Sequence, residues 1–72
     1  MKLYDGQTNA SYTVRGMNLP EQTARRLEAL GLVNGTTFAL VNKKKSALVV
    51  NIRGARFALG KKIAENIEVA QA

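Results

Sequence analysis

Residues 47–59 read ALVVNIRGARFAL, and this stretch decides the predicted fold. Apolar side chains recur at every second position on each side of Arg53-Gly54, which is typical of two half-buried strands joined by a two-residue turn. We therefore predict strands over 47–52 and 55–59, with the glycine at a turn position that favours positive φ. The residues that this alternation directs inward are Leu48, Val50, Ile52, Ala55, Phe57 and Leu59.

Three more short strands are predicted on either side of this hairpin. Residues 36–41 form one of them, and the polar residues 42–46 form the hairpin loop that leads into residue 47. Residues 10–15 and 66–70 supply the other two strands, and residues 60–65 form a short turn or a one-turn helix. The inward residues of these three strands are Tyr12, Val14, Phe38, Leu40, Ile67 and Val69.

One helix is predicted between the first and second strands. Pro20 suits the first helical position, because its missing N–H has no partner there in any case, and Glu21 places negative charge near the positive end of the helix dipole. Gly31 ends the helix in the left-handed conformation, and Leu32 then folds back onto Leu27. The apolar stripe of this helix is Ala24, Leu27 and Leu30.

Five short strands and one helix cannot bury their apolar faces as a flat sheet. The economical solution is a mainly β fold: a small, partly open SH3-like barrel of about five strands, with the helix between the first and second strands and one domain over residues 1–72. Closing such a barrel uses the inward side chains as core, so function would lie on the surface. The predicted core also includes Leu27, Leu30 and Leu32.

The composition narrows the classes of function. The chain has no cysteine and no histidine, which removes disulfides, thiol catalysis, zinc fingers and imidazole acid–base chemistry. No signal peptide and no apolar run of about 20 residues is visible. The net charge is +6, of which +5 falls on residues 42–72, so an acidic partner is favoured. We expect no enzyme activity, no cofactor, no metal site and no small-molecule substrate.

Three blocks of the sequence together resemble one protein family. Residues 26–35 read RLEALGLVNG, residues 54–60 read GARFALG, and residues 64–69 read AENIEV. They are similar to the R-x-L-x-x-L-G-[LM]-x-x-G, G-x-R-x-A-L and A-x-x-I-x-V motifs of the FeoA family of bacterial ferrous iron uptake, in the same order across nearly the whole chain. The resemblance implies an SH3-like barrel without catalytic activity.

The resemblance also implies a partner and a location. FeoA proteins are cytosolic and act with the membrane transporter FeoB, whose cytosolic domain binds guanine nucleotide. This chain would then be a cytoplasmic accessory protein, peripheral at the inner face of the membrane when docked, and a monomer or weak homo-oligomer. Two alternatives stay open: a basic small barrel that binds nucleic acid, and a stand-alone relative of the barrel domain of iron-dependent repressors. Nucleic acid is disfavoured because only two Tyr and two Phe are present.

Basic residues supply the first candidate partner-binding positions. Lys43, Lys44 and Lys45 form the hairpin loop in our prediction, where family members often carry Gly, Pro or acidic residues. They either contact an acidic surface of the transporter or lipid headgroups, or they form a solvated hairpin tip that discourages edge-to-edge pairing. Arg25 and Arg26 project away from the apolar face of the predicted helix and are candidates for an interaction surface. For Arg26 we favour a structural role, in which the aliphatic stem of its side chain packs across the mouth of the barrel.

Further candidates lie near the second motif and at the helix exit. Arg56 alternates outward from Phe57 and either contacts a partner or pairs with Glu68 on a neighbouring strand. Leu32 and Val33 are candidates for an apolar docking groove where the helix leaves the barrel. This groove requires that these side chains are exposed in the monomer.

Overall fold

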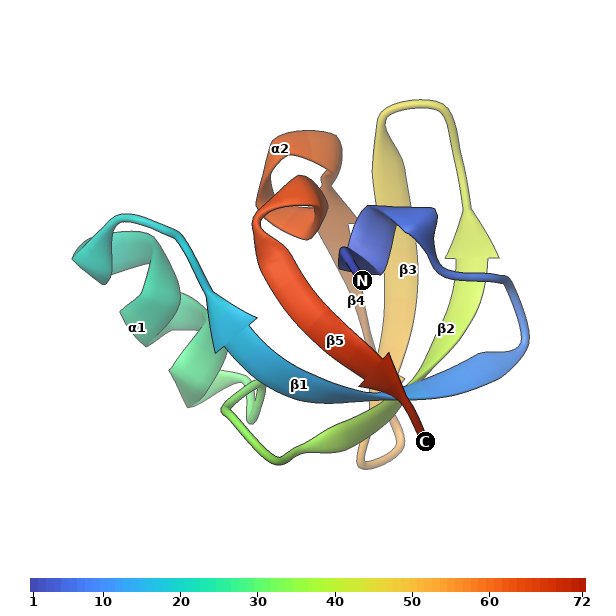
Figure 1. Cartoon of the computed structure of the whole chain (residues 1–72), viewed down its shortest axis with the longest axis horizontal. Helices are drawn as coiled ribbons and strands as arrows, with labels where there is room; N and C mark the ends of the chain where they lie inside the picture. Colours follow the sequence, from blue (N-terminus) through green and yellow to red (C-terminus); the bar gives the residue numbers. More distant parts are fainter.

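Five antiparallel strands form one sheet in the order β4-β3-β2-β1-β5. The computed structural model describes all residues, 1–72. Figure 1 shows the sheet curling around the core, with its two edge strands left unpaired with each other. The elements are η1 (Leu3–Asp5), β1 (Ala10–Met17), α1 (Glu21–Ala29), β2 (Thr37–Lys43), β3 (Ala47–Ile52), β4 (Ala55–Gly60), α2 (Lys61–Glu65) and β5 (Ile67–Gln71). The predicted mainly β, partly open SH3-like architecture is confirmed.

The hairpin of β3 and β4 forms as predicted. Arg53 has φ 53° and Gly54 has φ 87°, the pair of positive values that a two-residue type I′ turn requires. The side-chain Oδ1 of Asn51 accepts a hydrogen bond from the Gly54 N–H at 3.0 Å, which fixes the turn. The register Val50↔Phe57 keeps the apolar sets of the two strands on one face.

Two residues of β4 are less buried than the sequence predicts, although Phe57 still packs against the core. Ala55 is exposed and Phe57 is only partly buried, whereas Leu59 is 3% exposed. The alternation is right, but β4 is an edge strand. The helix α2 follows Gly60 and packs at the Leu59 end, so the end next to the turn remains open to solvent.

The exit of α1 has the predicted geometry. Gly31 has φ 96°, its N–H bonds to the Glu28 carbonyl, and the Leu32 N–H bonds to the Leu27 carbonyl, both at 2.9 Å. These two bonds define a Schellman ending, and the side chains of Leu27 and Leu32 both lie in the core. The start of the helix differs from the prediction: Pro20, with ψ 145°, is the N-cap residue, and Glu21 is the first helical residue.

The buried apolar face of α1 is narrower than the sequence predicts. Leu27 is the one residue of the helix that is buried, Ala24 is partly buried, and Leu30 is 38% exposed. Leu30 is the C-cap residue, where the chain already turns away from the helix axis toward β2. Its placement in the core was therefore wrong.

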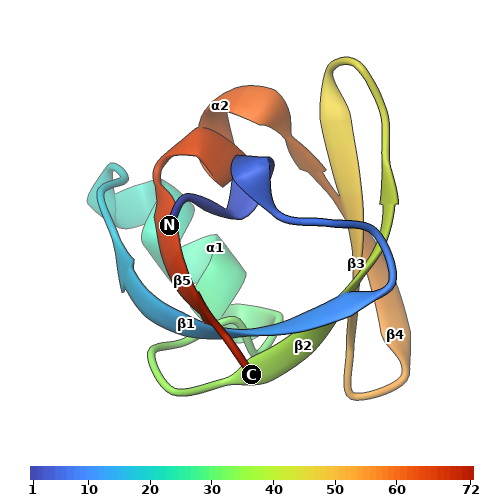
Figure 2. The ribbon, with the colours of Figure 1, turned by 45° about the vertical axis from the view of Figure 1, so that its right-hand side comes forward.

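The N-terminal segment completes the core, which the sequence analysis missed. The short 3-10 turn η1 inserts Leu3, which is 0% exposed, and α2 contributes Ala64, also 0% exposed. Tyr12 is buried, and its hydroxyl accepts a hydrogen bond from the Gln7 N–H at 2.7 Å. Figure 2 shows η1 lying between α2 and the hairpin of β2 and β3.

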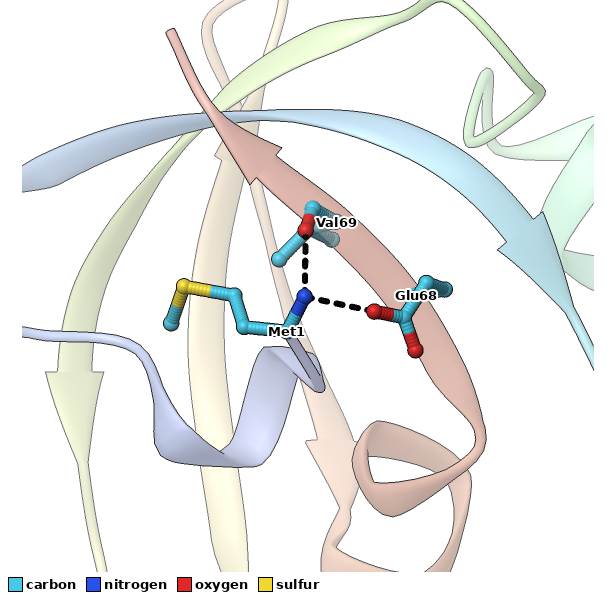
Figure 3. A network of polar contacts seen from close by, with 3 residues as sticks. All are labelled: Met1, Glu68 and Val69. Carbon is cyan, nitrogen blue, oxygen red and sulfur yellow. Dashed lines mark hydrogen bonds and ion pairs between the residues drawn. The ribbon is translucent and has the colours of Figure 1, made fainter.

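The first residue pairs along the outer edge of β5. The Val69 N–H donates to the Met1 carbonyl at 2.8 Å, and the Met1 ammonium donates to the Val69 carbonyl at 3.1 Å. The same ammonium forms an ion pair with the Glu68 carboxylate (Figure 3). Glu68 therefore pairs with Met1. The Arg56–Glu68 pair, one of the two alternatives for Arg56, does not form, because β4 and β5 are opposite edges of the sheet.

Candidate partner-binding surface

The interior offers no site for chemistry on a ligand. Every buried side chain is apolar apart from the tyrosine hydroxyl described above, and no buried side-chain nitrogen or oxygen lacks a hydrogen-bond partner. No three acidic side chains gather where they could hold a metal ion. None of the helices has the length and apolar character needed to cross a membrane. The features that remain are on the surface.

Most basic side chains have no acidic partner. The structure contains two ion pairs, Met1 with Glu68 and Arg25 with Glu21, so Arg25 is the one arginine or lysine with a carboxylate within 4.0 Å. The other ten basic side chains of the chain carry uncompensated charge. Such a surface attracts acidic partners over several ångströms and increases their rate of association.

The loop that carries Lys43, Lys44 and Lys45 is shorter than predicted. Strand β2 continues to Lys43, so the turn is reduced to residues 44–46. The Lys44 N–H donates to the Ala47 carbonyl at 2.8 Å and closes the turn. All three lysines are exposed, as a solvent-facing or partner-facing role requires. Their binding role stays a prediction.

Lys43 and Lys61 meet at the ring of Tyr4. The Lys43 Nζ lies 4.8 Å and the Lys61 Nζ 5.2 Å from the centroid of the Tyr4 ring, which is within cation–π range. We call Tyr4, Lys43 and Lys61 the Tyr4 cluster. Its members come from η1, the end of β2 and the start of α2. Sequence reasoning missed Tyr4 and Lys61, because no spacing in the chain links these three segments.

The arginines of α1 form a separate basic surface. Arg25 is exposed and pairs with Glu21 one helical turn earlier, and Arg26 is exposed too. The packing of the Arg26 stem across the barrel mouth stays a prediction. In Figure 1, α1 and the tip of the hairpin of β2 and β3 lie at opposite ends of the molecule, so these arginines and the Tyr4 cluster form separate parts of the surface.

The helix-exit groove is smaller than predicted. Leu32 is 1% exposed, because the Schellman ending folds it into the core, so it offers no docking surface. Val33 and Leu30 are 37% and 38% exposed. A shallow hollow at this position is lined by Met17, Ala24, Glu28, Leu32, Val33 and Asn34. Arg56 is exposed on the edge strand β4 opposite Asn51 of β3, without a carboxylate partner.

Comparison with known proteins identifies the family. The FeoA domain model matches residues 1–71 of this chain. The FeoA protein from Chlorobium tepidum, solved by NMR, shares 26% identity at a TM-score of 0.92, over 99% of this chain and 70% of that one. A crystal structure of an iron uptake regulatory protein (FeoA) shares 20% identity at a TM-score of 0.90, over 100% and 97% of the two chains.

A second group of similar structures consists of larger proteins. A manganese-dependent transcriptional repressor shares 19% identity at a TM-score of 0.89, with 100% of this chain matching 41% of the repressor. At this identity the likeness shows the fold alone. No curated protein sequence matches the chain.

Proposed function

Since this chain belongs to the FeoA family, which is associated with ferrous iron transport, we propose that it is an accessory protein of ferrous iron uptake that binds the membrane transporter FeoB on its cytosolic side. It would work from the cytoplasm and lie at the inner face of the membrane when docked. In this proposal the chain binds the transporter, and the transporter itself moves the iron.

One observation carries this proposal beyond family membership: the surface holds uncompensated positive charge. Ten of the eleven basic side chains have no carboxylate within 4.0 Å, and the net charge is +6. Unpaired exposed cations contribute little to the stability of the fold, so their presence fits an interaction role. The proposal requires an acidic cytosolic surface on the transporter that supplies the matching charge.

The test is direct binding to the cognate FeoB transporter in detergent. The chain is titrated at low and high salt, with the transporter free of nucleotide, bound to GDP and bound to a GTP analogue. We expect binding that weakens as salt rises, because exposed charges are screened over about 8 Å at physiological ionic strength. The variant Lys43→Glu/Lys44→Glu/Lys45→Glu should bind more weakly at low salt. Absence of binding in all three nucleotide states contradicts the proposal.

A further inference from the structure

We propose that the Tyr4 cluster is a preformed site for a carboxylate-rich segment of a protein partner. The inference deepens the proposed function, on which it rests for the identity of the partner. It goes further because it selects two lysines that are remote in sequence, Lys43 and Lys61, and the tyrosine whose ring both approach, over the basic surface as a whole.

The first argument is that two positive charges lie close to one tyrosine ring and have no acidic partner. Two ammonium groups lie 4.8 Å and 5.2 Å from one ring centroid, so like charges are brought together at one place on the surface. No carboxylate lies within 4.0 Å of either, although Asp5 is next to Tyr4 in the chain. Carboxylates of one acidic segment that reach both ammonium groups would supply the missing counter-charge and gain charge-assisted hydrogen bonds.

The second argument is that the cluster is held in place before any partner arrives. The Tyr4 hydroxyl donates to the Lys45 carbonyl at 3.2 Å, which ties η1 to the turn after β2. The Lys61 N–H donates to the Ser46 carbonyl at 3.0 Å, which ties α2 to the same turn. The Lys43 Nζ donates to the Gly6 carbonyl at 3.4 Å. Ordered side chains lose less entropy on binding, so a preformed site binds more tightly than a flexible tip.

The third argument selects a protein over nucleic acid. Binding of single strands relies on aromatic rings on which bases stack, and two ammonium groups already lie against the ring of Tyr4. Tyr12 and Phe38 are buried at 2% and 3% exposure, and Phe57 is partly buried on a distant strand edge. The surface therefore lacks a free stacking platform.

The fourth argument selects a protein over a lipid surface. The large apolar side chains exposed on the molecule are Met1, Leu30 and Val33, and none of them belongs to the cluster. Adhesion to a membrane would thus depend on a few lysines alone, without an inserting side chain. A segment of glutamates or aspartates needs no such insertion, because each carboxylate can pair directly with an ammonium group.

The first experiment uses an octaglutamate peptide as the probe and measures NMR shift changes of the intact chain at 0.15 M salt. We expect the largest shifts at the three residues of the cluster. In Lys43→Glu/Lys61→Glu the affinity should fall by about tenfold or more. The matched control Arg15→Glu/Arg53→Glu has the same change of charge at two exposed positions outside the cluster, and its loss should be about threefold or less, because screening limits remote charges. Equal losses in both variants overturn the inference.

Tyrosine variants separate the ring from its hydroxyl. Tyr4→Phe keeps the ring and loses the bond to the Lys45 carbonyl, whereas Tyr4→Leu loses the ring on which both ammonium groups rest. We expect peptide affinity to fall more in Tyr4→Leu than in Tyr4→Phe, at urea midpoints that confirm both are folded. Equal affinity in wild type and Tyr4→Leu contradicts a role of the ring.

Binding of the same variants to the transporter is measured as well, so that failure of this inference can be told from failure of the proposed function. If wild type binds FeoB and Lys43→Glu/Lys61→Glu binds as well as the arginine control, the proposed function stands and the cluster is overturned. If wild type binds the peptide at the cluster but no form of the transporter, the proposed function fails and the site stands. Tighter binding of a single-stranded oligonucleotide, or of phosphatidylserine vesicles, than of octaglutamate at equal salt overturns the choice of occupant.

Discussion

Replacement of Gly6 by alanine tests how tightly the N-terminal segment is packed. Gly6 is buried and has φ −71°, so its backbone suits any residue and the substitution adds no torsional strain. A Cβ at this position, however, would lie 3.0 Å from the Leu3 carbonyl oxygen and 3.0 Å from Cε2 of the Tyr12 ring. The perturbation is therefore purely one of packing.

Neither the Tyr12 ring nor the Leu3 carbonyl can shift easily to make room for the new methyl group. Tyr12 is 2% exposed, its hydroxyl is fixed by the Gln7 N–H, and its ring centroid lies 6.4 Å from that of Phe38. The Leu3 carbonyl accepts the N–H of Gly6 itself at 2.9 Å. Overpacking of this kind costs about 1–3 kcal/mol. The lower entropy of the unfolded alanine chain offsets about 0.4–1 kcal/mol, so we expect a net loss of roughly 1–2 kcal/mol.

Urea unfolding followed by far-UV circular dichroism measures this loss. The midpoint should fall with an unchanged m-value, and the melting temperature should fall by roughly 5–15 °C for a domain of this size. Gly16→Ala is the matched control, since Gly16 has no atom within 4 Å of an added Cβ and no positive φ. The control should be neutral or slightly stabilised. A Gly6→Ala protein as stable as the control would refute the packing argument.

Three further predictions concern other parts of the fold. Gly31→Ala should lower the free energy of unfolding by roughly 1–2 kcal/mol, measured by urea titration, because φ 96° strains any side chain although the nearest atom is 3.5 Å away. Glu68→Gln should cost no more than about 1 kcal/mol in the same assay, and the difference should vanish in 1 M salt, because the ion pair is solvent-exposed. Leu32→Ala should cost about 2–5 kcal/mol of unfolding free energy and Val33→Ala less than about 1 kcal/mol, a contrast that follows from 1% against 37% exposure.

Local rules of the chain were enough to predict most of the fold. The turn at Arg53-Gly54 and the helix stop at Gly31 depend on backbone preferences within a few residues, and both form as expected. Strand β3 has the predicted bounds, because alternation over six residues specifies both its length and its buried face. The FeoA motifs contain these same features, which is why the resemblance and the residue pattern led to one architecture.

The wrong predictions concern burial that depends on whether a second element packs over the first. Alternation correctly assigned Ala55 and Phe57 to the inner face of β4, but it does not reveal that β4 is an edge strand. In the same way, helical spacing put Leu30 beside Leu27 without indicating that the chain leaves the sheet at that residue. The turn η1 was missed because residues 3–5 are too few to show any period, although Leu3 is fully buried.

The Tyr4 cluster shows why the candidate site could be predicted only in part. The lysine run was visible in the sequence, but its organisation depends on η1, which carries Leu3 into the core and the half-buried Tyr4 to a position where two lysines approach its ring. One three-residue turn thus contributes to stability and to the proposed binding site together. A substitution in this turn or next to it that loosens Leu3, such as Gly6→Ala, should also weaken binding of acidic probes. Affinities of such variants therefore have to be compared where each is fully folded, so that a loss at the lysines is not confused with a loss of the fold.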